Sequence, residues 1–315
     1  MGFHWRLTVG DVKIKTTMAN ENILIFVNPK SGSGRSPALA SQIIKAASRR
    51  KIDTVLLEPS SPRGAIEHLQ ALLMSQVFTA VISIGGDGLA HLAIQILSII
   101  KIPLYVVPAG TGNDFARSNS LLSTNPEEIL DYVSKREPKM IDLGEIEIAG
   151  SSRRFGQILS TGFDAQVNER ANQNRIVKGR MKYNFATLAV LPKFKPISYE
   201  LEIDGVTRKL SAMLVAVANG ATYGGGMKLC PMAKRNDGLL DVMILHPVSK
   251  IELLKVFPKV YSGRHVGHPA VEFIQGKKIS ISAETVAYAD GERIGNLPIS
   301  VSVLEDSLMV WTVAP

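Results

Sequence analysis

Cysteine is almost absent from the sequence, because Cys230 is the only one among 315 residues. A single cysteine cannot form an internal disulfide, and it excludes a zinc site built on several cysteines. Long apolar runs are also missing. Stretches such as residues 92–100 are ended by Lys101, by glycine or by proline well before the ~20 residues that a membrane-spanning helix needs. We therefore expect a cytoplasmic protein that does not cross a membrane.

Aromatic residues are scarce at 6%, while apolar residues make up 45% and charged residues 20% of the chain. This composition is that of an ordinary globular protein and excludes disorder, collagen and coiled coil. We interpret residues 1–22 as a leader without the features of a signal peptide, with Met18 as a candidate start. The net charge is +8, and one segment, 170–195, contains no acid. Such a segment suits phosphates of a lipid surface, a nucleotide or a nucleic acid, and its basic residues are Arg170, Arg175, Lys178, Arg180, Lys182, Lys193 and Lys195.

The first half of the chain repeats a pattern of apolar strand, glycine-rich loop and helix. Apolar strands that alternate with helices predict a parallel sheet covered on both faces, and ligands bind beyond the carboxyl ends of such strands. The expected strands are 23–27, 54–57, 80–84 and 104–107, and the expected helices begin at 37 and lie near 63–74 and 89–99.

After residue 140 the pattern changes to alternating segments separated by Gly, Asp and Asn, which predicts mainly antiparallel strands. We place the domain boundary near 138–141, where the spacing of apolar residues changes from the first pattern to the second. The expected strands are 139–148, 198–203, 210–218, 239–245 and 279–282, with one helical interruption at 250–261.

Three loops of the first half carry the residues suited to chemistry: Asn28–Arg35 (NPKSGSGR), Gly85–Gly88 (GGDG) and Pro108–Ala116 (PAGTGNDFA). The first loop has neither the spacing of a Walker loop nor that of a dinucleotide-binding motif. Glycines let the backbone approach a phosphate, and Asp87 and Asp114 add two carboxylates at the strand ends. Backbone donors for phosphate oxygens, together with acids for Mg²⁺ or a nucleophile, are what phosphoryl transfer requires.

The ordered set NPKSGSGR, GGDG and PAGTGNDFAR resembles the diacylglycerol kinase catalytic family, which includes bacterial soluble lipid kinases and sphingosine kinases. The resemblance covers nearly the whole chain. Further motifs follow in order: STGFDA at 160–165, ANG at 218–220, YGGGM at 223–227, PMA at 231–233, NDGLLD at 236–241 and DGE at 290–292.

The resemblance implies an α/β N-terminal domain with a Rossmann-like parallel sheet, similar to that of NAD kinase, and a C-terminal, mainly antiparallel β-sandwich. We expect an ATP-binding domain over residues 20–139, completed by 306–315 with a last strand near Leu308–Val313, and a lipid-substrate domain over 140–305. The implied activity is transfer of the γ-phosphate of ATP, with Mg²⁺, to a lipid hydroxyl, with diacylglycerol giving phosphatidic acid as the leading case.

The resemblance also implies roles for individual residues. Glu292 would accept the proton of the lipid hydroxyl, with Asp290 beside it and Asp87 as the alternative base. Mg²⁺ would be held by Asp237 and the backbone carbonyls of Lys234 and Leu239, with Asp142 joined through water. The ATP-binding residues would be Asn28, Ser31, Gly32, Gly34, Arg35, Gly85, Gly86, Asp87, Gly88, Leu89, Ala90, His91, Gly110, Thr111, Asn113 and Asp114.

The chain departs from the family in one motif, where the usual GGDGTINE is GGDGLAHL. Leu89 replaces a hydroxyl, His91 an amide and Leu92 an acid. The alternatives that stay open are a kinase of another lipid (a sphingoid base or phosphatidylglycerol), an NAD kinase, and a catalytically weak nucleotide- or lipid-binding regulator. We expect reversible contact with a membrane that carries the lipid substrate, no nucleic-acid partner, and a sandwich edge that permits a homodimer.

Overall fold

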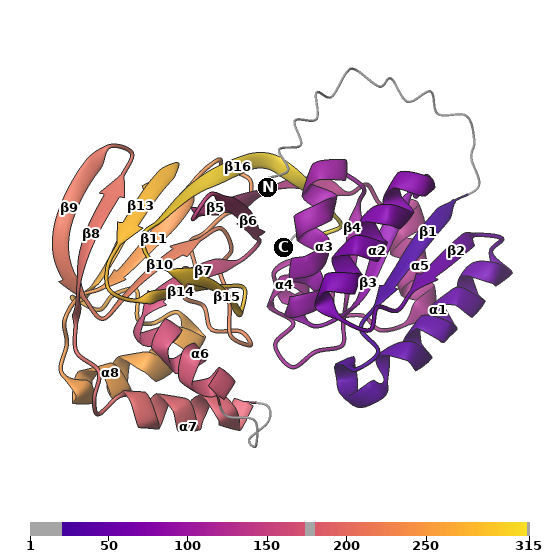
Figure 1. The fold of residues 1–315 in the computed structure, drawn as a ribbon. Coiled ribbons are helices and arrows are strands. Elements are labelled where there is room, and N and C mark those ends of the chain that lie inside the picture. Colours follow the sequence, from indigo (N-terminus) through magenta and orange to yellow (C-terminus); the bar gives the residue numbers. More distant parts are fainter. Residues whose placement is uncertain (1–20, 174–179, 314–315) are drawn as a thin grey trace.

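The structure is a computed structural model that describes residues 21–173 and 180–313. Residues 1–20 of the leader, with Met18, and Arg175 and Lys178 of the basic segment, lie outside these residues. The described chain forms an α/β half and a β-rich half that lie side by side (Figure 1). Within the described residues, no helix has the length and apolar character that spanning a membrane requires.

The first half is built on four parallel strands in the order β2-β1-β3-β4. Side chains of β1 alternate between the two faces, so that Leu24 and Phe26 pack against α2 and α3 while Ile23 and Ile25 pack against α1 and α5. The strands are β1 (Asn22–Val27), β2 (Asp53–Leu57), β3 (Ala80–Gly85) and β4 (Leu104–Pro108), and the helices are η1 (Ser31–Gly34), α1 (Ser36–Arg49), α2 (Pro62–Ser75), α3 (Asp87–Ile100), α4 (Asp114–Ser118) and α5 (Pro126–Lys135).

The second half is a sandwich of two mainly antiparallel sheets, with a core of residues such as Leu201, Val215 and Val242 between them. One sheet has the order β12-β11-β10-β7-β14-β15, and the other contains β16, β13, β8 and β9, with β5 and β6 beside β16. The strands are β5 (Lys139–Ile148), β6 (Ser151–Phe155), β7 (Ile158–Gly162), β8 (Ile197–Ile203), β9 (Val206–Ala212), β10 (Leu214–Ala218), β11 (Leu240–Leu245), β12 (Val271–Gly276), β13 (Lys278–Ser282), β14 (Val286–Ala289), β15 (Glu292–Asn296) and β16 (Ile299–Val310).

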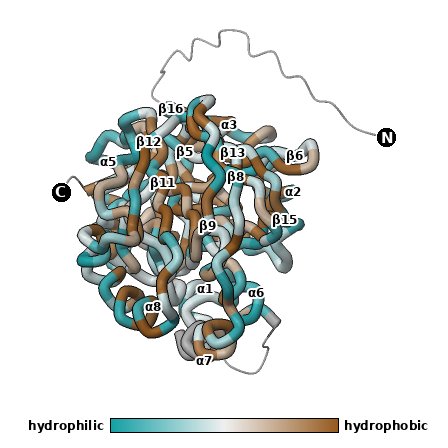
Figure 2. The backbone as a smooth tube through the Cα atoms, turned by 90° about the vertical axis from the view of Figure 1, so that its left-hand side faces the viewer, coloured by the Kyte–Doolittle hydropathy of each residue, from teal (hydrophilic) through white to brown (hydrophobic). Residues whose placement is uncertain are grey.

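Helices cover the outer face of the six-stranded sheet of the sandwich, where a second apolar cluster lies. In Figures 1 and 2 helices α6, α7 and α8 lie together at the lower side of the sandwich, and Figure 2 shows apolar tracts on α7 and α8. They are α6 (Phe163–Gln173), α7 (Arg180–Val190), α8 (Lys250–Val256) and η2 (Phe257–Ser262).

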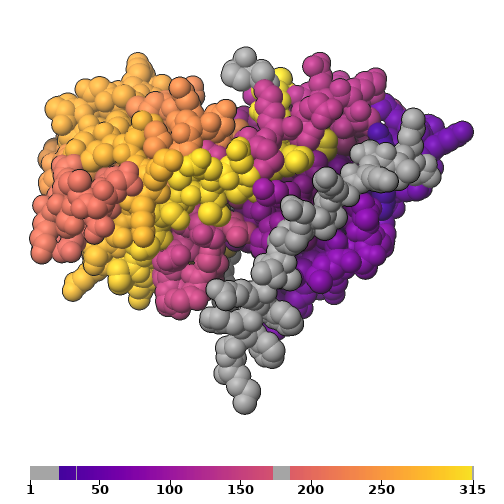
Figure 3. Space-filling view, turned by 90° about the horizontal axis from the view of Figure 1, so that it is seen from above, coloured from indigo at the N-terminus to yellow at the C-terminus, as the bar shows by residue number. Residues whose placement is uncertain are grey.

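Strand β16 belongs to both halves. It pairs antiparallel with β13 and β5 inside the sandwich, and its last residue, Val310, pairs in parallel with Leu104 of β4. Trp311 then packs beside Tyr105 in the core of the first half and donates its Nε1–H to the carbonyl of Arg136 at 2.8 Å. The parallel sheet and one sheet of the sandwich are thus a single ten-stranded sheet of the described chain, and Figure 3 shows these C-terminal residues, in yellow, between the two halves.

Two expectations about the second half are wrong. Residues 210–218 do not form one strand, because the chain changes sheets at Met213: β9 pairs with β8, whereas β10 pairs with β7 and β11. Residues 250–261 are not the one helical interruption, because α6 and α7 precede them. The apolar spacing of Phe163, Val167 and Ala171 is the helical signal that the alternating-strand interpretation overlooked.

Candidate active site

The three glycine-rich loops meet at the carboxyl edge of the parallel sheet. A Cβ atom on Gly110 would lie 2.5 Å from the Cα of Gly86, so the second and third loops touch through their backbones. A Cβ atom on Gly32 would lie 3.2 Å from the carbonyl oxygen of Ala109, which places the first loop beside the third. Glycine is required at Gly110 because any side chain would drive the two loops apart.

Two carboxylates lie close together in these loops. Asp87 begins α3 and accepts the backbone N–H of Phe115 at 3.1 Å. A Cβ atom on Gly112 would lie 2.6 Å from Asp87 Oδ2 and 3.3 Å from Asp114 Oδ2, so both carboxylates face the same glycine. Burial, and then the neighbouring charge of Asp114, raises the pKa of Asp87 from 3.8 to about 6.

Asp114 connects the two halves of the molecule. It begins α4, and its carboxylate accepts the backbone N–H groups of Gly225 at 2.6 Å and Gly226 at 2.7 Å. Burial raises the pKa of Asp114, although the two N–H groups act in the opposite direction. The motif at 223–227 was noticed in the sequence, but its contact with Asp114 was not expected.

Asp290 and Glu292 occupy one tight turn of the β14–β15 hairpin, in which Asp290 has a φ of +50°. The Asp290 carboxylate accepts three backbone N–H groups, from Gly156 at 2.7 Å, Gln157 at 3.0 Å and Ile158 at 3.2 Å. Glu292 is exposed, and a Cβ atom on Gly88 would lie 3.4 Å from its Oε1. The turn therefore uses Asp290 to fix the backbone and leaves Glu292 facing the second glycine loop.

His91, which replaces the amide of the family pattern, lies beside Asp290. Its ring is buried, and its Nδ1 is 3.5 Å from Asp290 Oδ2 across the boundary between the halves. The Nδ1 atom has no hydrogen-bond partner of normal geometry. His91 thus packs the first turns of α3 against the hairpin that carries Glu292.

A cavity of about 770 Å³ joins these groups. The loops contribute four carboxyl groups to its lining, those of Asp87, Asp114, Asp290 and Glu292. The helices on the sandwich contribute mostly apolar side chains. These include Phe163, Val167, Phe257 and Tyr261, together with Ile94 of α3 and Met227.

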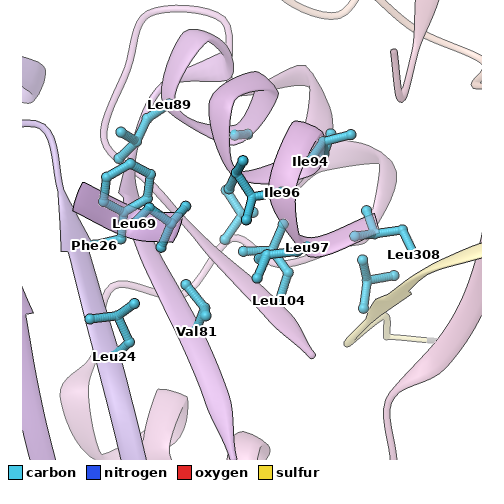
Figure 4. Packing of buried hydrophobic residues seen from close by; sticks show 14 of the residues in the cluster. Leu24, Phe26, Leu69, Val81, Leu89, Ile94, Ile96, Leu97, Leu104 and Leu308 are labelled. Carbon is cyan, nitrogen blue, oxygen red and sulfur yellow. The ribbon is translucent and has the colours of Figure 1, made fainter. Parts of the chain in front are cut away.

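The structure brings six of the sixteen expected nucleotide-site residues to this cavity. Leu89 points away from it and packs in the core with Phe26 and Leu69 (Figure 4). The first loop lies at the same edge of the sheet without lining the cavity. The lining residues are Asp87, Gly88, Ala90, His91, Thr111 and Asp114, and those outside it are Asn28, Ser31, Gly32, Gly34, Arg35, Gly85, Gly86, Leu89, Gly110 and Asn113.

The expected metal residues lie elsewhere, where β5 and β16 cross between the halves. Both carboxylate oxygens of Asp142 accept backbone N–H groups, from Gly238 and Asp306 at 2.9 Å each. Asp237 is exposed, and its Oδ1 accepts the N–H of Leu239 at 3.2 Å. Among residues 21–173 and 180–313, no three His, Cys, Asp or Glu side chains gather in a way that could hold a metal.

One polar group in the cavity was missed by sequence reasoning. Asp164, at the start of α6, accepts the Ser160 hydroxyl at 2.5 Å and the Asn168 amide at 3.2 Å, and also contacts Tyr223. Burial raises the pKa of Asp164. The only signal was an acid within the GFDA motif, which by itself gave no role.

Comparisons with known proteins agree with this architecture. Residues 22–146 match the family model of the diacylglycerol kinase catalytic domain, and residues 157–312 match that of the YegS C-terminal NAD kinase β-sandwich-like domain. A diacylglycerol kinase of Mycobacterium tuberculosis is 35% identical over 291 residues, which cover 91% of this chain and 94% of that protein. One from Bacillus subtilis is 26% identical, covering 87% and 90%. A crystal structure of a diacylglycerol kinase from Bacillus anthracis, 21% identical, superimposes with a TM-score of 0.70 over 95% of this chain and 98% of that one.

The fold and the matches define the class of protein as a kinase that acts on lipids, with an α/β domain and a β-sandwich domain. The chain belongs to the diacylglycerol kinase family.

Proposed function

We propose that this lipid kinase transfers the γ-phosphate of ATP, with Mg²⁺, to the hydroxyl of diacylglycerol and forms phosphatidic acid. The observation that carries the proposal is one cavity lined both by the carboxylates of the glycine loops and by apolar side chains of the helices. A polar reaction centre next to an apolar slot suits an acceptor that has one hydroxyl and two acyl chains. The names of the related diacylglycerol kinases support the same acceptor.

The start of α3 supports phosphate binding. Its N-cap is Gly86, and no side chain caps it; the same is true of α1 and α4, which begin at the other two glycine-rich loops. Uncapped N–H groups at a helix N-terminus favour anions. In our proposal the phosphates of ATP lie against this helix start and Thr111, because both border the cavity beside Asp87.

In the chemical step, the lipid hydroxyl oxygen attacks the γ-phosphorus and forms a new O–P bond. The bond from the γ-phosphorus to the bridging oxygen breaks, and ADP leaves with that electron pair. The hydroxyl proton passes to a carboxylate, for which Glu292 is our first choice because it faces Gly88 and is not used by backbone N–H groups as Asp290 is. Asp87, with its pKa raised to about 6, is a base suited to neutral pH and is the alternative.

The apolar side of the cavity would hold the acyl chains. Phe163 and Val167 of α6 and Phe257 of η2 line it, and they exclude water from the reaction centre when the lipid is bound. The Asp164 cluster, with Ser160 and Asn168, lies among these residues and offers hydrogen bonds to the polar part of a lipid.

Magnesium would be held by oxygen ligands, since Mg²⁺ keeps several waters and needs only one or two carboxylates. Asp237 supplies an exposed carboxylate, and the carbonyls of Lys234 and Leu239 belong to the same loop. Asp142 would act through water, because its own oxygens are taken by two N–H groups. When bound, the ion would fix this loop.

The test is transfer of labelled γ-phosphate from ATP with Mg²⁺ to diacylglycerol, phosphatidylglycerol and a sphingoid base in mixed micelles, and to NAD in solution. We expect label on diacylglycerol. Glu292→Gln should reduce kcat by about 10²–10⁴-fold, as removal of a general base does, while Glu284→Gln, an exposed acid outside the cavity, keeps wild-type kcat. Label on NAD alone, or full activity of both Glu292→Gln and Asp87→Asn, contradicts the proposal.

A further inference from the structure

The helical segment formed by α8 and η2 carries apolar residues on two faces. Leu253, Val256 and Val260 are buried against the sandwich, as expected of a surface helix. Ile251 and Leu254 point the other way and are 69% and 48% exposed. A helix that is apolar on both faces normally has partners on both, yet on the outer face the described chain supplies none.

The neighbouring helix α7 has the same property. Ala186, and Leu191 just after the helix, are buried, whereas Phe185 and Leu188 are 52% and 62% exposed. The two helices are adjacent, since Lys250 Nζ at the start of α8 donates a hydrogen bond to the carbonyl of Pro192, just after α7. Figures 1 and 2 show both on the same side of the sandwich. We call Phe185, Leu188, Ile251, Leu254 and Tyr261 the apolar patch.

The apolar patch borders the mouth of the catalytic cavity. Tyr261 is 46% exposed and also lines the cavity, so the cavity reaches the surface there. Phe257 of η2 and Thr187 of α7, each within a few residues of the patch along its helix, line the same cavity. The cavity that contains Asp87 and Glu292 therefore extends to both apolar helices, with the exposed Tyr261 at its edge.

The charges around the patch are mostly positive. Lys255 and Lys259 flank it on the α8 side, and exposed Lys193 and Lys195 follow α7. The one acid between residues 250 and 262 is Glu252, which is engaged by His268 at 3.1 Å and Lys255 at 3.6 Å. Exposed apolar side chains with a basic rim suit a bilayer that contains anionic lipids.

We propose that the apolar patch is the surface by which this protein docks onto an anionic membrane, with the cavity mouth pressed against the bilayer. The benefit to catalysis rests on the proposed function: a lipid acceptor would move from the bilayer into the cavity without crossing water. Four exposed large apolar side chains beside Tyr261 would enter the boundary between headgroups and acyl chains, and the lysines would lie at the level of the headgroups.

The test is co-sedimentation with vesicles of phosphatidylcholine and phosphatidylglycerol that contain no diacylglycerol, without ATP. We expect wild type to bind, and Ile251→Ser/Leu254→Ser to bind at least about tenfold more weakly, because each substitution removes apolar groups that the bilayer would bury. The matched control is Met74→Ser/Val77→Ser, which removes two exposed apolar side chains from the first half and should bind like wild type. Lys255→Glu/Lys259→Glu should weaken binding in a salt-dependent way.

Binding that is equal in wild type and Ile251→Ser/Leu254→Ser overturns the proposal. So does a wild-type dimer that becomes monomeric in that variant by sedimentation velocity, because the patch would then join two copies of the chain. Turnover of a short-chain, water-soluble diacylglycerol separates the two proposals. If wild type binds vesicles but phosphorylates no lipid, the docking surface stands and the proposed function fails. If the variant keeps wild-type turnover of the soluble acceptor and loses vesicle binding, both stand.

Discussion

The raised pKa of Asp87 makes the stability of the folded protein depend on pH in a predictable direction. In the folded state its pKa is about 6, against 3.8 for an ordinary aspartate, so the folded state holds this proton more tightly than the unfolded state. The contribution of Asp87 to the free energy of unfolding is therefore fully present below pH 3.8 and is lost as the pH rises through about 6. A difference of about two pKa units corresponds to about 3 kcal/mol. Asp87→Asn, which mimics the neutral carboxyl, should escape that loss.

The assay is urea unfolding at pH 4.5 and pH 7.5, followed by circular dichroism. We expect Asp87→Asn to be more stable than wild type by about 3 kcal/mol at pH 7.5 and by only about 1 kcal/mol at pH 4.5. Asp53→Asn, on the exposed side of β2, serves as the control and should follow the wild-type pH profile. The reasoning is refuted if the advantage of Asp87→Asn is absent or does not change between the two pH values. The kinase activity of Asp87→Asn should be lost at both pH values.

Three further expectations concern particular contacts. Gly110→Ala should raise the KM for ATP at least tenfold and lower the free energy of unfolding by about 1–3 kcal/mol, because its Cβ would lie 2.5 Å from the Cα of Gly86. Gly267→Ala, which has open space around it, should be neutral in the same kinetic and unfolding assays. Asp290→Ala should cost about 3 kcal/mol in urea unfolding, since it strands three backbone N–H groups, and Asp290→Asn should recover part of this; equal losses would contradict the hydrogen-bond explanation. Leu308 is a fully buried residue of β16 in the core of the first half. Leu308→Ala should lower the free energy of unfolding by about 2–5 kcal/mol, and a loss below about 1 kcal/mol would mean that this core does not hold β16.

The first half could be predicted from the sequence because its signals are local. Apolar strands, glycine loops and amphipathic helices each occupy a short window, and α2 and α3 begin within two residues of where the pattern puts them. The convergence of Asp87 and Asp114 also follows, since the carboxyl ends of neighbouring parallel strands share one edge of the sheet.

The parts that could not be predicted depend on contacts between distant segments. Residues 210–218 are apolar except for Ser211, and nothing within them shows that Met213 is where the chain passes to the other sheet. The bond of Asp114 to Gly225 joins residues 111 positions apart and exists only after both halves fold. Leu89 was assigned to the nucleotide by its place in a motif, but its apolar side chain gains more from the core beneath α3.

The strand shared by the two halves also orders events during synthesis. Leu308, Val310 and Trp311 fill the core of the first half, although they are made after the whole sandwich. While the ribosome is still translating the sandwich, β4 has an unpaired edge where Val310 will later lie beside Leu104. The nascent first half therefore cannot complete its core until residues 299–311 have left the ribosome, and part of its apolar surface is exposed to water until then. A nascent chain halted shortly before Ile299 would lack a strand in both halves, and we would expect it to be a preferred target of chaperones and proteases.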